Sequence, residues 1–190
     1  MFKRISLTAT FFAAAAAPAF AHLNPEEHGS FMAGVSHPLF GADHILAMVA
    51  VGLWASQIGG RALLAVPAAF VGTMALGFAL AVAGVGLPFV EPAILASVIG
   101  LGLLVAAAVR LPIAASAAVV GVFALFHGHA HGGELGTAGA LQFGLGFMVA
   151  TAALHAAGIG AGIGLSRLGP VVTRVLGALT AIGGAALILG

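Results

Sequence analysis

The stretch ALLAVPAAFVGTMALGFALAVA, residues 62–83, decides the fold class because it carries no charged side chain from end to end. A helix needs about 20 consecutive apolar residues to cross the hydrocarbon core of a bilayer, and this stretch is long enough. The whole chain of 190 residues is 62% apolar and 6% charged. A soluble domain has roughly a quarter charged residues, so the composition excludes an ordinary water-soluble protein.

Further apolar segments lie on both sides of this stretch, separated by proline, glycine and charged residues. Together the six segments cover residues 30–56, 62–83, 92–109, 112–127, 137–164 and 170–189. Their lengths predict an all-α fold, a polytopic membrane helical bundle in which six transmembrane helices form one domain at residues 22–190. The segments leave no room for a nucleotide-binding domain, and no G-x-x-x-x-G-K-[ST] phosphate loop occurs in the chain.

The first residues have the pattern of a secretory signal. Lys3 and Arg4 precede an apolar run over residues 5–17, and the small-residue pattern Ala-Phe-Ala follows at residues 19–21. This pattern predicts a signal peptide at residues 1–21 that is cleaved from the mature protein. An uncleaved first helix is the alternative, but its roughly 16 apolar residues are too few to span a bilayer. After cleavage, the free α-amine and imidazole of His22 could together chelate a metal ion.

The charged residues of the predicted loops indicate an orientation. The arginines fall on one side of the bundle: Arg61, Arg110, Arg167 and Arg174. The glutamates fall on the other side: Glu26, Glu27, Glu91 and Glu134. Because positive loops stay in the cytoplasm, the pattern predicts a multi-pass protein of the bacterial inner membrane with both ends of the mature chain in the periplasm.

Composition also narrows the ligands that the chain could bind. The formal net charge is +1, so no basic patch is available to bind nucleic acid. Cysteine is absent, which excludes thiolate ligands, whereas histidine occurs eight times. A bound metal ion would therefore be held by imidazole, carboxylate or thioether groups.

The segment HPLFGADH, residues 37–44, brings polar groups into the first apolar segment. His37 and His44 lie two turns apart on one face of a regular helix, and Asp43 lies on another face. A break of the helix at Pro38 and Gly41 would let all three side chains meet at one metal ion. The alternative is a purely structural hydrogen bond between Asp43 and His44.

The segment FHGHAHGGE, residues 126–134, follows the fourth apolar segment. If the helix continues through it, His127, His131 and Glu134 share a face and His129 points away. An extended loop would instead align His127, His129 and His131. Histidine-rich tracts are typical of metal binding, although a solvated loop with incidental histidines is the alternative.

His155 lies near the middle of the fifth apolar segment, with Thr151 one turn before it on the same face. We expect Thr151 to hydrogen-bond this imidazole and the imidazole to bind a metal ion. A hydrogen bond between helices is the alternative role of His155. With His22 and His28 outside the membrane, the histidines form a series of increasing depth, as movement of an ion requires.

The segments HPLFGADHILAMVAVGLWA, FHGHAHGGE and GFMVATAALHAAGIGAG closely resemble signature sequences of the HupE/UreJ family of nickel and cobalt permeases. The resemblance implies uptake of Ni²⁺, with Co²⁺ as a second candidate, in support of hydrogenase or urease maturation. It implies a transporter and not an enzyme, with the ion as substrate and no prosthetic group. It also implies three metal-binding groups: His37, Asp43 and His44; His127, His131 and Glu134; and His155. His129 occupies a variable position of the family pattern.

Two other classes of protein fit the same residues. A metal sensor or delivery protein would bind the ion without transporting it, so a measured flux separates it from a permease. A membrane haem protein would use His44 and His155 as axial ligands and would show a Soret band. The expected partners are a divalent transition-metal ion and the lipid bilayer. The glycines at residues 158, 160, 162 and 164 fit packing within one chain or between the chains of a homo-oligomer.

Overall fold

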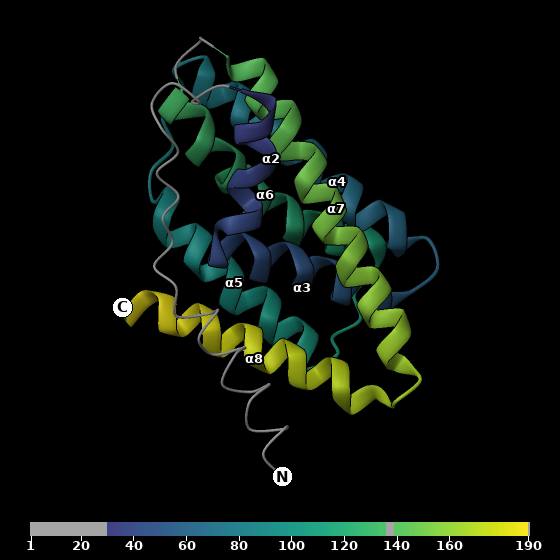
Figure 1. Ribbon diagram of the computed structural model, residues 1–190. Helices are drawn as coiled ribbons and strands as arrows, with labels where there is room; N and C mark the ends of the chain where they lie inside the picture. The colour runs from purple at the N-terminus through teal and green to yellow at the C-terminus, as the bar shows by residue number, and fades with distance from the viewer. Residues whose placement is uncertain (1–29, 136–138, 190) are drawn as a thin grey trace, which may run out of the picture.

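The computed structural model describes residues 30–135 and 139–189, and every regular element among them is a helix. This confirms the all-α prediction. Figure 1 shows the helices packed side by side in one bundle. In chain order they are α2 (Phe31–Phe40), α3 (Ala42–Ile58), α4 (Ala62–Val82), α5 (Val90–Ala106), α6 (Ile113–Leu135), α7 (Ala140–Ser166) and α8 (Pro170–Leu189).

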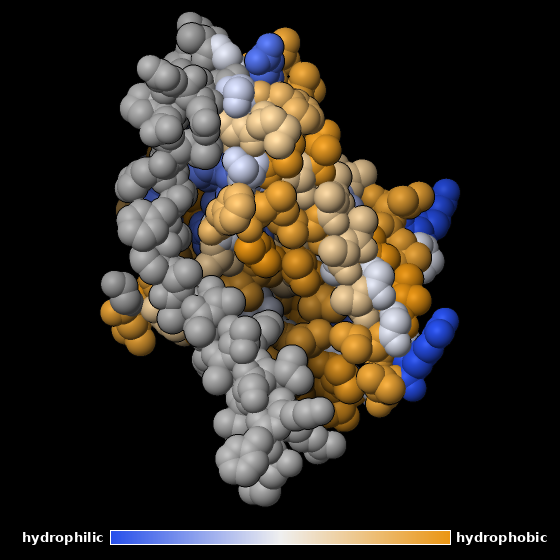
Figure 2. Space-filling model, viewed as in Figure 1, coloured by the Kyte–Doolittle hydropathy of each residue, from blue (hydrophilic) through white to orange (hydrophobic). Residues whose placement is uncertain are grey.

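Several of these helices are long and apolar enough to cross a membrane. Within the described residues α4, α6, α7 and α8 meet this criterion individually, and α2 and α3 meet it together as a bent pair. Helix α5 is apolar but has 17 residues, fewer than the roughly 20 of a typical span. Figure 2 shows a surface dominated by apolar residues, as lipid contact requires. The expected signal peptide at residues 1–21 lies outside the described residues.

The first apolar segment is not one helix, because its two parts, α2 and α3, meet at an angle of 82°. Pro38 lies inside α2, and Gly41 between the helices has an extended backbone with φ −82° and ψ 117°. A Cβ atom at Gly41 would lie 2.9 Å from His44 Nδ1 and 3.0 Å from Asp43 Oδ1. The break that the sequence suggested at Pro38 and Gly41 is therefore present, and the missing side chain of Gly41 leaves room for both polar groups.

Glycines allow the helices to approach closely. Helix α4 packs along α6, where Gly77 faces the carbonyl oxygen of Leu125 and Gly128 faces that of Met74. Helix α3 packs along α7 in the same way, with Gly52 against the backbone of Gly158. Such close backbone contact is typical of membrane helix pairs.

Some of the glycines at residues 158, 160, 162 and 164 of α7 pack against another helix of this chain. Gly158 lies against Val49 and Gly52 of α3, and Gly162 lies against Ser56. Gly160 and Gly164 have no described atom within 4 Å of a Cβ position. One face of the run therefore contacts α3, and the other faces away from the described helices.

The end of the bundle near the arginines is closed by hydrogen bonds to backbone carbonyls. Trp54 Nε1 donates to Val109 O at 2.7 Å, and Arg174 Nε donates to Ala106 O at 2.8 Å. These bonds join the C-terminal ends of α3 and α5 to the N-terminal end of α8. Since Arg61 follows α3 and Arg110 follows Val109, these arginines gather at one end of the bundle, as the sequence predicts.

The close contact of α4 with α6 predicts different effects for two glycines on α4. Gly77→Ala places a methyl group against Leu125 O and forces the helices apart, so we expect it to destabilise the protein by about 1–3 kcal/mol. Gly72→Ala is the matched control, since no described atom lies within 4 Å of its Cβ position. Thermal unfolding in detergent should show a lower midpoint for Gly77→Ala only. Equal midpoints for the two variants would contradict this packing.

Candidate metal centre

Three histidines from three helices converge inside the bundle. His37 comes from α2, His44 from α3 and His131 from α6, and one ring nitrogen of each lies within 4.8 Å of the other two. His44 and His131 are buried, with exposed fractions of 3% and 7%. Their Nε2 atoms are 2.7 Å apart, so one of the two must carry a hydrogen and donate it to the other. We call these three residues the histidine cluster.

The local structure of two sequence motifs produces this cluster. The 82° bend between α2 and α3 turns His37 back toward His44, and the two ring centroids are 5.3 Å apart. Helix α6 continues past His127 to Leu135, which carries His131 into the bundle, where its ring centroid lies 4.2 Å from that of His37. The helical interpretation of residues 126–134 is therefore correct. The structure places His131 beside the histidines of the first motif, and the predicted group of His127, His131 and Glu134 stays a prediction because the Glu134 side chain lies outside the described part.

Asp43 lies behind His44 and is not a member of the cluster. Its Oδ1 is 2.9 Å from His44 Nδ1, and its side chain is 28% exposed. A carboxylate beside Nδ1 favours the tautomer with hydrogen on that atom, which leaves the Nε2 lone pair directed at the cluster. The pairing of Asp43 with His44, which the sequence offered as the structural alternative, is thus present as a 2.9 Å contact, and it orients the imidazole toward the cluster. In this structure the helical geometry does not bring the carboxylate itself to that point.

His127 lies beside the cluster, one turn before His131 on α6. It is fully buried, and its ring centroid is 5.3 Å from that of His44. Ser97 Oγ donates its hydrogen to Ile94 O at 2.6 Å and lies 2.9 Å from His127 Nε2. A hydroxyl has one hydrogen, so His127 Nε2 donates to Ser97 and its Nδ1 keeps the lone pair.

His155 stands apart from the histidine cluster. It is 1% exposed, and its ring packs edge-on against Phe70 with centroids 5.0 Å apart. The expectation that Thr151 bonds this imidazole is wrong, because Thr151 Oγ1 donates to Met74 Sδ at 3.7 Å instead. The thioether of Met74 on α4 thus accepts the hydrogen bond of Thr151 on α7.

The remaining candidate ligands have different positions. His129 Nε2 donates to Val85 O at 2.7 Å, away from the cluster, as the helical interpretation predicts. The backbone of Glu134 lies in the last turn of α6, and its side chain lies outside the described part. His22 and His28 also lie outside the described residues.

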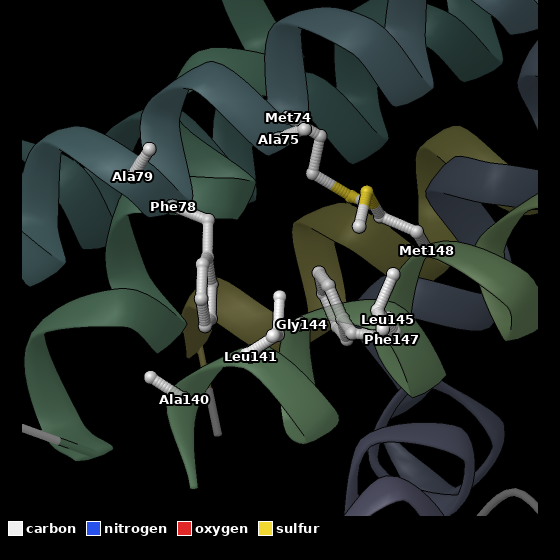
Figure 3. Close-up of a pocket in the computed structure, with 10 residues that line it drawn as sticks. All are labelled: Met74, Ala75, Phe78, Ala79, Ala140, Leu141, Gly144, Leu145, Phe147 and Met148. Atoms are coloured by element: carbon white, nitrogen blue, oxygen red, sulfur yellow. The ribbon is translucent and has the colours of Figure 1, made fainter. Parts of the chain in front are cut away.

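The ring of Phe147 borders the cluster, and the sequence analysis did not identify this residue. The Phe147 ring contacts all three cluster histidines, with centroid distances of 6.0 Å to His37, 5.8 Å to His44 and 5.0 Å to His131. Phe147 also lines an apolar pocket of about 190 Å³ between α4 and α7, together with Met74 and Met148 (Figure 3). Phe147 therefore contacts both the histidine cluster and this apolar pocket.

Ser97 was also missed by the sequence analysis. Its hydroxyl is fully buried, and the signal available in the sequence was a polar residue within an otherwise apolar segment. Its partner, His127, lies on another helix, so helical spacing alone could not pair them.

The contact of Asp43 with His44 predicts a graded loss of metal binding. Asp43→Asn removes the charge that orients His44, so we expect the affinity of the purified chain for Ni²⁺ to fall about 10–100-fold. Asp43→Glu keeps a carboxylate and should recover part of the loss. Titration calorimetry in detergent gives both affinities. Wild-type affinity in Asp43→Asn would show that the carboxylate does not act on the site.

Comparison with known proteins agrees with the resemblance of the three motifs. The family model described as HupE / UreJ protein matches residues 10–187. Protein HupE of Rhizobium leguminosarum bv. viciae is 49% identical over 190 aligned residues, which cover 98% of this chain and 100% of the relative. No solved structure matches the chain significantly. Because the family model and the relative both extend over nearly the whole sequence, the chain belongs to the HupE/UreJ protein family.

Proposed function

We propose that this protein is a membrane permease that imports Ni²⁺, with Co²⁺ as a second substrate, from the periplasm to the cytoplasm. The observation that carries the proposal is the convergence of His37, His44 and His131 from three helices of an apolar bundle, with His44 and His131 buried and His37 half-buried. Polar groups inside a membrane protein are costly and are retained mainly for function. Three such groups on three helices fit an ion pathway better than helix packing.

The chemistry of the cluster supports a borderline transition-metal ion as the substrate. Imidazole nitrogen is a good ligand for Ni²⁺ and Co²⁺, whereas Mg²⁺ and Ca²⁺ prefer oxygen ligands. Metal–imidazole bonds are about 2.0–2.1 Å long, so two imidazoles on one ion stand about 3 Å apart or more. The 2.7 Å separation of His44 and His131 therefore has to open slightly, and their shared hydrogen has to move, when the ion enters.

The contacts of the cluster account for transport of the ion by exchange of its ligands, and no covalent bond has to form or break. The cluster histidines exchange with water molecules of the hydrated ion, and the charge of Asp43 behind His44 offsets part of the ionic charge. Moderate binding by neutral ligands permits release as well as entry. A membrane potential that is negative inside favours inward movement of a divalent ion by about 4–5 kcal/mol per 100 mV. The chain needs no nucleotide and no prosthetic group for this function.

The proposal includes the predicted topology in the bacterial inner membrane. Residues 1–21 are cleaved, the helices of the bundle provide six spans, and the arginine-rich end faces the cytoplasm. The family resemblance supports delivery of the imported metal to hydrogenase or urease maturation. In the mature chain, His22 and Glu134 add ligands at the periplasmic entrance.

Uptake of radioactive nickel tests the proposal directly. In cells that lack their own nickel importers, expression of this chain should produce uptake, and His44→Ala should reduce uptake to the level of cells without the chain. His129→Ala is the matched control, because His129 bonds Val85 O and lies outside the cluster. Cobalt, zinc and copper as competitors would rank the ions.

Two results would contradict the proposal, the first its ion pathway and the second the transport itself. Wild-type uptake by His44→Ala would remove the cluster from the pathway. Absence of uptake by the wild-type chain, with insertion verified by membrane fractionation, would favour a sensor or delivery protein. A Soret band in that purified protein would instead favour the haem alternative.

A further inference from the structure

We propose a second metal position, deeper in the bundle, formed by His155 of α7 and Nδ1 of His127 of α6. This inference rests on the proposed function, since it adds an inner station to the same ion pathway. A divalent transition-metal ion would pass from the histidine cluster to this position before release. The ligands would be two neutral imidazoles, completed by water molecules that travel with the ion.

The surroundings of His155 carry the proposal. Its imidazole is 1% exposed, and neither Nδ1 nor Nε2 makes a hydrogen bond within the described residues. A polar atom sealed from water without a partner is destabilising, and folded proteins avoid it unless the group has another role. Phe70 covers one side of the ring, and the one nearby hydroxyl of α7, Thr151, is engaged by Met74. His155 therefore does not serve as a hydrogen bonder between helices, and its ring nitrogens are available to bind a metal ion.

His127 supplies the second ligand atom. The bond of its Nε2 to Ser97 fixes the tautomer, and Nδ1 is buried without a partner in the described residues. The ring of Phe70 contacts both imidazoles, with centroids 5.8 Å from His127 and 5.0 Å from His155. The two histidines thus contact the same aromatic ring, which places them at neighbouring points of one path through the bundle.

The placement of the pair extends the pathway in one direction. His127 adjoins His44 of the cluster, with centroids 5.3 Å apart. His155 packs beside Gly52, which lies farther along α3 than His44 by about 12 Å at 1.5 Å per residue. The inner position is therefore about two turns nearer the arginine-rich end. Fewer protein ligands than in the cluster would make it weaker, which suits onward release.

The absence of cysteine from the chain provides a specific test. We would purify the full chain as His155→Cys, add Co²⁺, and record the near-ultraviolet absorption. If His155 binds the metal, the new thiolate should give a sulfur-to-cobalt charge-transfer band that the wild-type chain cannot show. Val149→Cys is the matched control, because it lies on the same helix with 55% exposure and should give no band. Absence of the band in His155→Cys would overturn the proposal.

Binding stoichiometry separates the inner position from the cluster. Equilibrium dialysis should give two Ni²⁺ ions per wild-type chain, and His155→Gln and His44→Ala should each bind one ion fewer. Thermal unfolding in detergent would verify that both variants are folded. One ion per chain in both wild type and His155→Gln, with normal nickel uptake by the variant, would overturn the inner position and leave the permease intact. No bound ion in the wild-type chain would overturn both.

Discussion

Burial of imidazole in an apolar bundle is the constraint on which this structure depends. Each neutral ring has one donor and one acceptor nitrogen, and the lipid around the helices supplies neither partner. His44 has the Asp43 carboxylate 2.9 Å from Nδ1 on one side and His131 Nε2 2.7 Å from Nε2 on the other. The carboxylate beside Nδ1 leaves Nε2 for a metal ion, so one contact both places a charge beside the buried ring and prepares it for binding.

The arrangement of the helices brings the three cluster histidines together. A straight helix through residues 30–58 would leave His37 and His44 two turns apart, whereas the 82° bend at Gly41 folds one toward the other. His131 arrives from α6, which is held against α4 by glycines at the points of closest approach. The cluster is therefore built from a broken helix and a closely packed one. Both features depend on glycine at the positions where a side chain would clash with a neighbouring group.

The sequence predicted much of the local structure and less of the long-range pairing. Segment lengths and proline positions indicated the helices, and helical periodicity correctly separated His129 from His127 and His131. Periodicity describes one helix at a time, so it could not reveal that His37 and His44, from two other helices, lie beside His131. For the same reason, the bond of Ser97 to His127 and the bond of Thr151 to Met74 could not be read from spacing.

The central claim is that imidazoles from two distant motifs bind one ion. Nickel X-ray absorption of purified His155→Gln protein, loaded with one equivalent of Ni²⁺, tests it most directly because the outer position then holds the metal. The account predicts a coordination shell containing three imidazoles that falls to two in the same protein with His131→Ala. A shell of oxygen atoms alone, or one unchanged by His131→Ala, would contradict the claim.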